Sequence, residues 1–415
     1  MPVTATSAAE TVEAVFRIES PRIIAGLTRI VRDVGIAEEL AQDALVAALE
    51  QWPESGVPEK PGAWLTATAK HRAIDLVRRR ETYARKLAEV GRTLEDLPPP
   101  EPPDEEEIDD DLLRLIFTAC HPVLSTQARI ALTLRLLGGL TTAEIARAFL
   151  ATEPAVAQRI VRAKRTLAAS GVPFEVPGPE DRAARLSSVL EVIYLIFNEG
   201  YSATAGDDLV RPALCEDALR LARVLAGLMP GESEVHGLVA LLEFQASRIP
   251  ARTGPDGAPV LLAEQHRARW DRLLMHRGIE ALHRAGGELA GPYSVQAAIA
   301  ACHARAARYE DTDWATIAAL YGRLMALAPS PVVELNRAVA VSMADGPQAG
   351  LDLVDALAEE PALQDYHLLP SARGDLLERL GRNAEARAEF ERAAALTRNA
   401  RERDLLLARA GRQAR

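Results

Sequence analysis

The stretch LTTAEIARAFLATEPAVAQRIVRAKRTL, residues 140–167, predicts two helices joined by a short turn. Thr141 followed by Glu144 has the spacing of a capping box, so the first helix is expected to begin there. Thr152 is a good N-cap for the second helix. Pro154 suits its first turn, where a missing N–H costs nothing. This arrangement decides how the rest of the chain is interpreted.

The second helix of this stretch has two different faces. Val156, Ile160, Ala163 and Leu167 recur at helical spacing and predict a buried face, opposite a basic one. A helical hairpin whose second helix is basic outside has the geometry that enters a DNA major groove, with base readout near its N-terminus and phosphate contacts beyond. A hairpin with a merely solvated basic face, or a response-regulator output domain, remains an alternative. The expected DNA-contacting residues are Thr152, Ala155, Gln158, Arg159, Arg162, Lys164 and Arg165.

The composition indicates an all-α fold. The chain has 415 residues, of which 48% are hydrophobic and only 4% aromatic, and Ala, Leu and Arg recur throughout. Its net charge of -11 argues against a protein coated in nucleic acid. Local DNA binding is still compatible with that charge, because binding follows the local potential rather than the sum.

No membrane or secretory segment is expected. No apolar run reaches the roughly 18 residues that a membrane span needs, and the first ten residues lack the features of a signal peptide. The three cysteines, Cys120, Cys215 and Cys302, are odd in number and far apart. A disulfide framework is therefore not expected, in keeping with a reducing, cytoplasmic location.

The chain divides into regions by composition. Residues 11–80 are helical with a basic end, and residues 81–111 are interpreted as a linker that ends in PPPEPPDEEEIDDD, because such a sequence lacks apolar surface and repels itself. Residues 112–170 are helical again and include the opening stretch. After a second break, residues 181–415 predict helix after helix with short Gly/Pro turns.

The last region contains one clear repeat unit. Gly374, Gly381, Ala386 and Phe390 have offsets that resemble a tetratricopeptide unit, and Gly346 lies 35 positions before Gly381. Earlier units are degenerate. The sequence predicts a tetratricopeptide-like helical domain without chemistry of its own, whose concave surface binds a protein or peptide.

Two stretches near the N-terminus predict amphipathic helices of opposite charge. AEELAQDALVAALEQW (37–52) predicts an amphipathic helix with an acidic outer face, and PGAWLTATAKHRAIDLVRRR (61–80) predicts a basic one. A basic helix with an aromatic residue at its start suits a phosphate backbone and unstacked bases.

Together these stretches resemble region 2 of the extracytoplasmic-function (ECF) group of sigma-70 family RNA polymerase sigma factors. The resemblance rests on Glu39-Leu40-Ala41-Gln42-Asp43, Pro61 to Leu65, Ala69-Lys70-His71 and Asp75 to Arg80, although His71 stands where Asn is common. The hairpin resembles region 4 of the same group. FNEGY (197–201) and GPYSVQAAIAACHA (291–304) resemble the subgroup with a tetratricopeptide-like C-terminal domain.

The resemblance implies a role in promoter-specific transcription initiation, modulated by the C-terminal domain. Residues 11–80 would bind the polymerase core at the β′ clamp helices and the -10 promoter element, and residues 112–170 would bind the -35 element and the β flap. The implied polymerase-binding residues are Glu39, Gln42 and Asp43. The implied -10 residues are Trp64, Lys70, His71, Arg72, Arg78, Arg79 and Arg80.

Two other classes of protein fit the sequence less well. An enzyme or metal site is disfavoured, because Cys120-His121 and Cys302-His303 are adjacent pairs that point apart on a helix, and no metal-ligand or phosphate-loop spacing occurs. No cofactor is expected. A one-component helix-turn-helix regulator with a helical sensor domain explains the hairpin but leaves residues 37–80 without a role.

Overall fold

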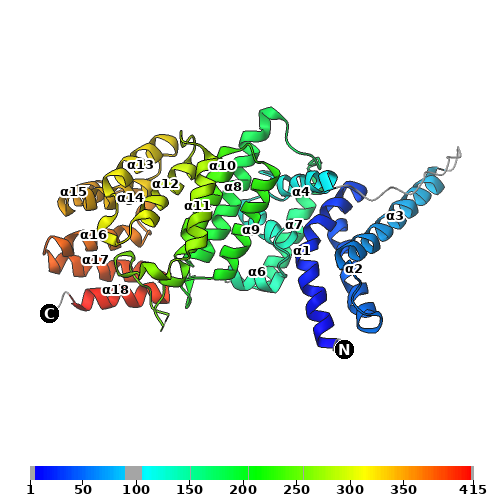
Figure 1. Ribbon diagram of the computed structural model, residues 1–415, viewed down its shortest axis with the longest axis horizontal. Coiled ribbons are helices and arrows are strands. Elements are labelled where there is room, and N and C mark those ends of the chain that lie inside the picture. The colour runs from blue at the N-terminus through cyan, green and yellow to red at the C-terminus, as the bar shows by residue number, and fades with distance from the viewer. Residues whose placement is uncertain (1–4, 89–104, 150, 204, 256, 413–415) are drawn as a thin grey trace. The chain divides into compact units, whose positions relative to one another are not determined.

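The computed structural model describes residues 5–88, 105–149, 151–203, 205–255 and 257–412, and within them the chain is almost entirely α-helical (Figure 1). The predicted all-α class is confirmed. The chain forms two compact units, Met1–Val192 and Ile193–Arg415, here called unit 1 and unit 2. No helix of the described part is long and apolar enough to cross a membrane.

The first three helices of unit 1 pack on one another through small residues. They are α1 (Ala5–Val31), α2 (Val34–Ser55) and α3 (Pro61–Ala88). Alanines of α2, such as Ala41 and Ala44, are fully buried, which lets neighbouring helix backbones approach closely. Asp33 caps α2, because its carboxylate accepts the N–H of Ile36 at 3.0 Å.

The remaining helices of unit 1 contain the predicted helix-turn-helix. They are α4 (Glu105–Ala119), α5 (Thr126–Leu136), α6 (Thr142–Ala148) and α7 (Glu153–Ala169). The capping box at the start of α6 is confirmed: the Thr141 hydroxyl accepts the N–H of Glu144, and the Glu144 carboxylate accepts the N–H of Thr141. Thr152 occupies the N-cap position of α7 but makes no side-chain capping hydrogen bond.

The interpretation of residues 81–111 as a linker without packed structure is wrong at both ends. The helix α3 continues to Ala88, and α4 begins at Glu105, within the acidic run; residues 89–104 lie outside the described residues. Asp111 is buried. Its carboxylate oxygens lie 3.2 Å from Arg29 and 2.6 Å from Arg114, and these ion pairs balance its charge. Acidic residues also suit the N-terminal turns of a helix, where the macrodipole is positive.

The boundary expected at residue 181 lies further along the chain. The helix α8 (Pro179–Tyr201) begins after the predicted break, but its first half belongs to unit 1. Ser188 donates a hydrogen bond to the carbonyl of Cys120 at 2.7 Å, and Arg185 donates one to the carbonyl of Phe117 at 3.0 Å. These contacts hold residues 181–192 against α4, which composition could not indicate.

Unit 2 continues as helices of which most consecutive pairs lie side by side (Figure 1). Its five single-turn 3-10 helices are Ile249–Ala251, Leu262–Glu264, Arg267–Arg269, Tyr309–Asp311 and Pro361–Leu363. Its further α-helices are α9 (Pro212–Leu228), α10 (Ser233–Ser247), α11 (Arg272–Ala285), α12 (Pro292–Arg305), α13 (Trp314–Leu327), α14 (Pro331–Ala344), α15 (Pro347–Ala356), α16 (Leu368–Arg379), α17 (Asn383–Leu396) and α18 (Ala400–Arg412).

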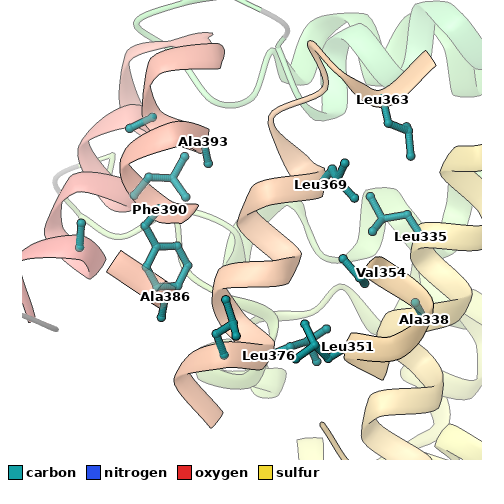
Figure 2. Close-up of a cluster of buried hydrophobic side chains, with 14 residues drawn as sticks. Leu335, Ala338, Leu351, Val354, Leu363, Leu369, Leu376, Ala386, Phe390 and Ala393 are labelled. Atoms are coloured by element: carbon teal, nitrogen blue, oxygen red, sulfur yellow. The ribbon is translucent and has the colours of Figure 1, made fainter. Parts of the chain in front are cut away.

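The repeat predicted around Gly374 is a helical hairpin formed by α16 and α17. A Cβ added at Gly374 would lie 2.8 Å from the ring of Phe390, so the glycine permits the close crossing of the two helices. Figure 2 shows Phe390 among Ala386, Ala393 and Leu376 in the buried cluster that joins α14 to α18. Gly346 and Gly381 lie at turns, each with a positive φ.

The two ends of unit 2 meet, unlike those of an open solenoid in which each repeat contacts only its neighbours. The strand β1 (Ala205–Gly206) pairs in parallel with β2 (Arg398–Asn399). The fully buried Asn399 side chain donates to the carbonyls of Ala203 and Asp208, both at 3.0 Å. These bonds satisfy a buried amide and join the first and last parts of the unit.

Candidate nucleic-acid interface

The helix α7 presents the two faces that its sequence predicts. Val156, Ile160, Ala163 and Leu167 are all buried, which confirms the apolar face. Thr152, Ala155, Gln158, Arg162 and Arg165 are exposed, and Arg159 is half-buried. Among the described residues, none of these three arginines forms an ion pair, so their positive charges remain available to an anionic partner.

Lys164 is the exception on this helix. Its ammonium contacts the carboxylate of Glu38 on α2, and Glu38 is only 5% exposed. The same carboxylate accepts hydrogen bonds from the Arg135 guanidinium at 2.6 Å and from the Gln42 amide at 2.9 Å. Glu38 thus joins α2 to α5 and α7, a role that sequence reasoning missed. In the sequence, only its position one turn before Gln42 pointed to a contact of Glu38 with another side chain.

The outer face of α2 is acidic and accessible. Glu39 and Asp43 are exposed, whereas Gln42 is half-buried and donates to Glu38. Asp43 lies 3.6 Å from Arg72 on α3, and the Asp43 side chain is 62% exposed and that of Arg72 41%. An exposed pair of this kind contributes at most about 1 kcal/mol to stability, so it leaves the acidic face open to a protein partner.

The basic helix α3 follows α2 and its loop. His71, Arg78, Arg79 and Arg80 are exposed, and Lys70 and Arg72 are half-buried. Trp64 is half-buried, and its ring packs in a T-shaped arrangement against the buried Trp52, with centroids 5.5 Å apart. The helix therefore combines an aromatic start with exposed basic side chains at residues 78–80.

The cysteines and histidines do not form a recognisable catalytic constellation. Within the described residues, no group of three His, Cys, Asp or Glu side chains is placed to hold a metal ion. Burial raises the pKa of the Cys120 thiol to about 11 and that of Cys215 to about 12, so neither is a reactive thiolate near neutral pH.

The arrangement defines a class of protein. A helix-turn-helix with an exposed basic recognition helix is joined, within one compact unit, to a three-helix module that has one acidic and one basic helix. Phosphate contacts and base readout suit the first, and protein docking together with single-strand contacts suits the second. This combination is that of a promoter-reading subunit.

Comparison with known families agrees with this class. Residues 15–83 match the model of sigma-70 region 2, and residues 114–167 match that of sigma-70 region 4. Residues 185–286 match a family of unknown function, DUF6596. No solved structure matches the chain.

Relatives fall into two groups. An uncharacterized protein of Rhizobium meliloti is 46% identical over 92% of this chain and 91% of its own length. The ECF RNA polymerase sigma factor SigK of Mycobacterium sp. (strain KMS) is 30% identical over 30% of this chain and 64% of its own length. SigK of Mycobacterium ulcerans is 28% identical, over 30% and 67% respectively.

The chain belongs to the ECF group of sigma-70 family RNA polymerase sigma factors, as its region 2 and region 4 matches and its SigK relatives show. Its partners are therefore RNA polymerase core enzyme and promoter DNA. The one-component regulator is not favoured, because it has no use for region 2.

Proposed function

We propose that this sigma factor directs promoter-specific initiation through three surfaces of unit 1, and that unit 2 modulates its activity. The observation that carries the proposal is the pairing of an exposed acidic face on α2 with two exposed basic surfaces, on α3 and α7, in one compact unit. One surface suits a protein, and the other two suit nucleic acid.

The acidic face of α2 docks on polymerase core. Glu39 and Asp43 offer exposed carboxylates, and Gln42 lies between them on the same face. Such a face fits the β′ clamp helices if these present basic side chains, and the region 4 module contacts the β flap. Charge complementarity of this kind speeds association and selects the partner.

The basic helix α3 holds the -10 element. Lys70, His71 and Arg72 lie midway along it, and the exposed Arg78, Arg79 and Arg80 follow two turns later. Their charges suit the phosphates of a melted strand. Trp64, packed on Trp52 at the start of α3, contacts DNA with its exposed part.

The helix α7 reads the -35 element. Ala155, Gln158 and Arg159 lie near its N-terminus, where a recognition helix meets base edges, and Thr152 precedes them. Arg162 and Arg165 suit phosphates. Lys164 exchanges its carboxylate partner for a phosphate when DNA binds. The exchange is affordable because Arg135 still neutralises Glu38.

Unit 2 acts as an attached regulator. The hairpin of α16 and α17 resembles a tetratricopeptide unit, because Gly374 allows the two helices to cross closely beside the Phe390 ring. A surface built from such hairpins suits a protein or peptide partner. The modulating role rests on the fusion of this unit to two polymerase-binding modules.

Reconstituted transcription tests the proposal. Purified chain is added to RNA polymerase core with a promoter chosen from transcripts that depend on this protein, and specific initiation is expected. The variant Asp43→Arg should lose initiation and core binding while keeping its fold. The control, Gln51→Arg, places the same side chain at another exposed site of α2. Equal core binding by both variants would remove α2 from the interface. Tight duplex binding without polymerase would favour a one-component regulator.

A further inference from the structure

A cavity of about 270 Å³ lies inside unit 2, among α8, α10, α12, α13 and α14. Its apolar wall comes from Leu241, Ile299 and Leu324. Eight polar or aromatic side chains also line it, namely Tyr194, Phe244, Gln245, Arg248, Gln296, His303, Tyr321 and Asn336. A cavity that combines an apolar wall with converging polar groups is the usual form of a small-molecule site.

The cavity contains a positive charge without a negative one. No Asp or Glu lines it. Arg248 donates only to amide oxygens, those of Gln265 at 3.4 Å and Gln245 at 3.5 Å. Its guanidinium also lies 5.2 Å from the ring centroid of Trp270. Among the described residues, no carboxylate forms an ion pair with Arg248.

The titratable side chains near Arg248 add no negative charge to the cavity. Burial, with Arg248 and Arg267 nearby, lowers the pKa of His303 to about 4, so the imidazole is neutral near pH 7. Burial first, and Arg248 among other charges, also lowers the pKa values of Arg252 and Arg267. The Nδ1 atom of His303 is buried and has no hydrogen-bond partner among the described residues. A neutral imidazole offers one donor and one acceptor.

These features are costly unless something fills the cavity. The half-buried guanidinium of Arg248 loses part of its hydration, which its long amide contacts replace only in part, and the buried unpaired imidazole nitrogen adds to the loss. An anion placed beside Arg248 would restore both, since charge-assisted hydrogen bonds to a carboxylate are the strong ones. The single lining arginine matches a single negative charge. The volume suits a small molecule rather than a length of peptide chain.

We propose that this cavity binds a small organic monocarboxylate, whose carboxylate meets Arg248 and His303 and whose apolar part lies against Leu241, Ile299 and Leu324. Unit 2 is then a receptor for a small acid as well as a helical scaffold. Its effect on transcription rests on the modulating role proposed above, whereas binding itself does not.

Calorimetric titration of the full chain, without polymerase or DNA, tests the proposal. The probes are phenylacetate and hexanoate, with phenylacetamide as the neutral counterpart of the first. At least one acid should bind one-to-one, and phenylacetamide should bind at least tenfold more weakly than phenylacetate, because the neutral amide has no negative charge to pair with Arg248. The absence of saturable binding by either acid overturns the proposal, as does equal affinity for phenylacetate and phenylacetamide.

Three variants locate the site. Arg248→Met should weaken acid binding at least tenfold. Ala300→Phe leaves every polar group in place but fills the cavity, so it should abolish binding even if Arg248→Met is poorly folded. The control Arg272→Met removes an exposed arginine of α11 outside the cavity and should bind as the parent does. Unchanged binding by Ala300→Phe, or tighter binding of a short peptide than of either acid, contradicts the proposal. If the full chain binds the acid but supports no promoter-specific initiation, only the proposed function fails and the binding proposal stands.

Discussion

Arg162 shows how much a single exposed side chain of α7 is expected to contribute. It is exposed, without an ion pair among the described residues, on a helix whose opposite face is buried. Arg162→Ala should weaken -35 binding by ~1–3 kcal/mol if a base contact is lost, and less if only a phosphate contact is lost. The control Arg182→Ala removes an exposed arginine at the start of α8. Footprinting of the polymerase complex measures both, and equal footprints would remove Arg162 from the interface.

Lys164 distinguishes a permanent contact from an exchangeable one. If it leaves Glu38 for a phosphate, Lys164→Met should reduce the slope of log affinity against log salt by about one. Arg165→Met, an exposed neighbour without an ion pair among the described residues, supplies the reference loss. Salt titration of promoter binding measures both slopes. A slope lowered by Arg165→Met but not by Lys164→Met would mean that Glu38 retains the lysine.

His303 makes the stability of unit 2 depend on pH. Its pKa of about 4 in the folded chain lies below its ordinary value of 6.5. In that interval the unfolded chain binds a proton that the folded chain does not, so the stabilisation is fully present above about pH 6.5 and is lost as the pH falls towards 4. The thermal midpoint should therefore drop between about pH 7.5 and about pH 5. His303→Gln should reduce that drop, and an equal drop in this variant would contradict the assignment to His303.

At the scale of elements, the crossing of α16 and α17 depends on the absence of a side chain at Gly374. Gly374→Ala should destabilise unit 2 by about 1–3 kcal/mol, since the added Cβ meets the Phe390 ring at 2.8 Å. Gly322→Ala, in α13, meets nothing within 4 Å and should instead stabilise the unit by up to ~1 kcal/mol through helix propensity. Denaturant unfolding measures both changes, and equal effects would contradict the packing argument.

At the scale of the whole molecule, the position of the cut decides what a truncation reports. A chain that ends after Val192 keeps the contacts of Ser188 and Arg185 with α4, whereas one that ends at residue 175 loses them. The longer fragment should initiate transcription at a rate several-fold different from that of the full chain if unit 2 modulates activity. Transcription assays that compare the longer fragment with the full chain measure this difference. Equal rates would contradict the modulating role.

Much of the candidate interface could be predicted, because helical periodicity and caps are local. The spacing of Val156, Ile160, Ala163 and Leu167 identified the buried face of α7, and Thr141 with Glu144 identified the start of α6. The ion pair between Lys164 and Glu38 could not be predicted in this way. Nothing in its local pattern separates it from Arg165, and its partner lies on α2, far away in the sequence.

The sequence by itself determined the helical class, the repeat at Gly374, the basic and acidic helix faces and the family, since each depends on the order of residues over a few helical turns. Only the tertiary structure decided which charges are neutralised. Glu38 meets Arg135 across 97 positions, Asp111 is buried between arginines, and Asn399 closes unit 2. It also left Arg248 in a cavity without a carboxylate. Burial and pairing depend on which helices come together, and a periodic pattern determines the faces of a helix but not its neighbours.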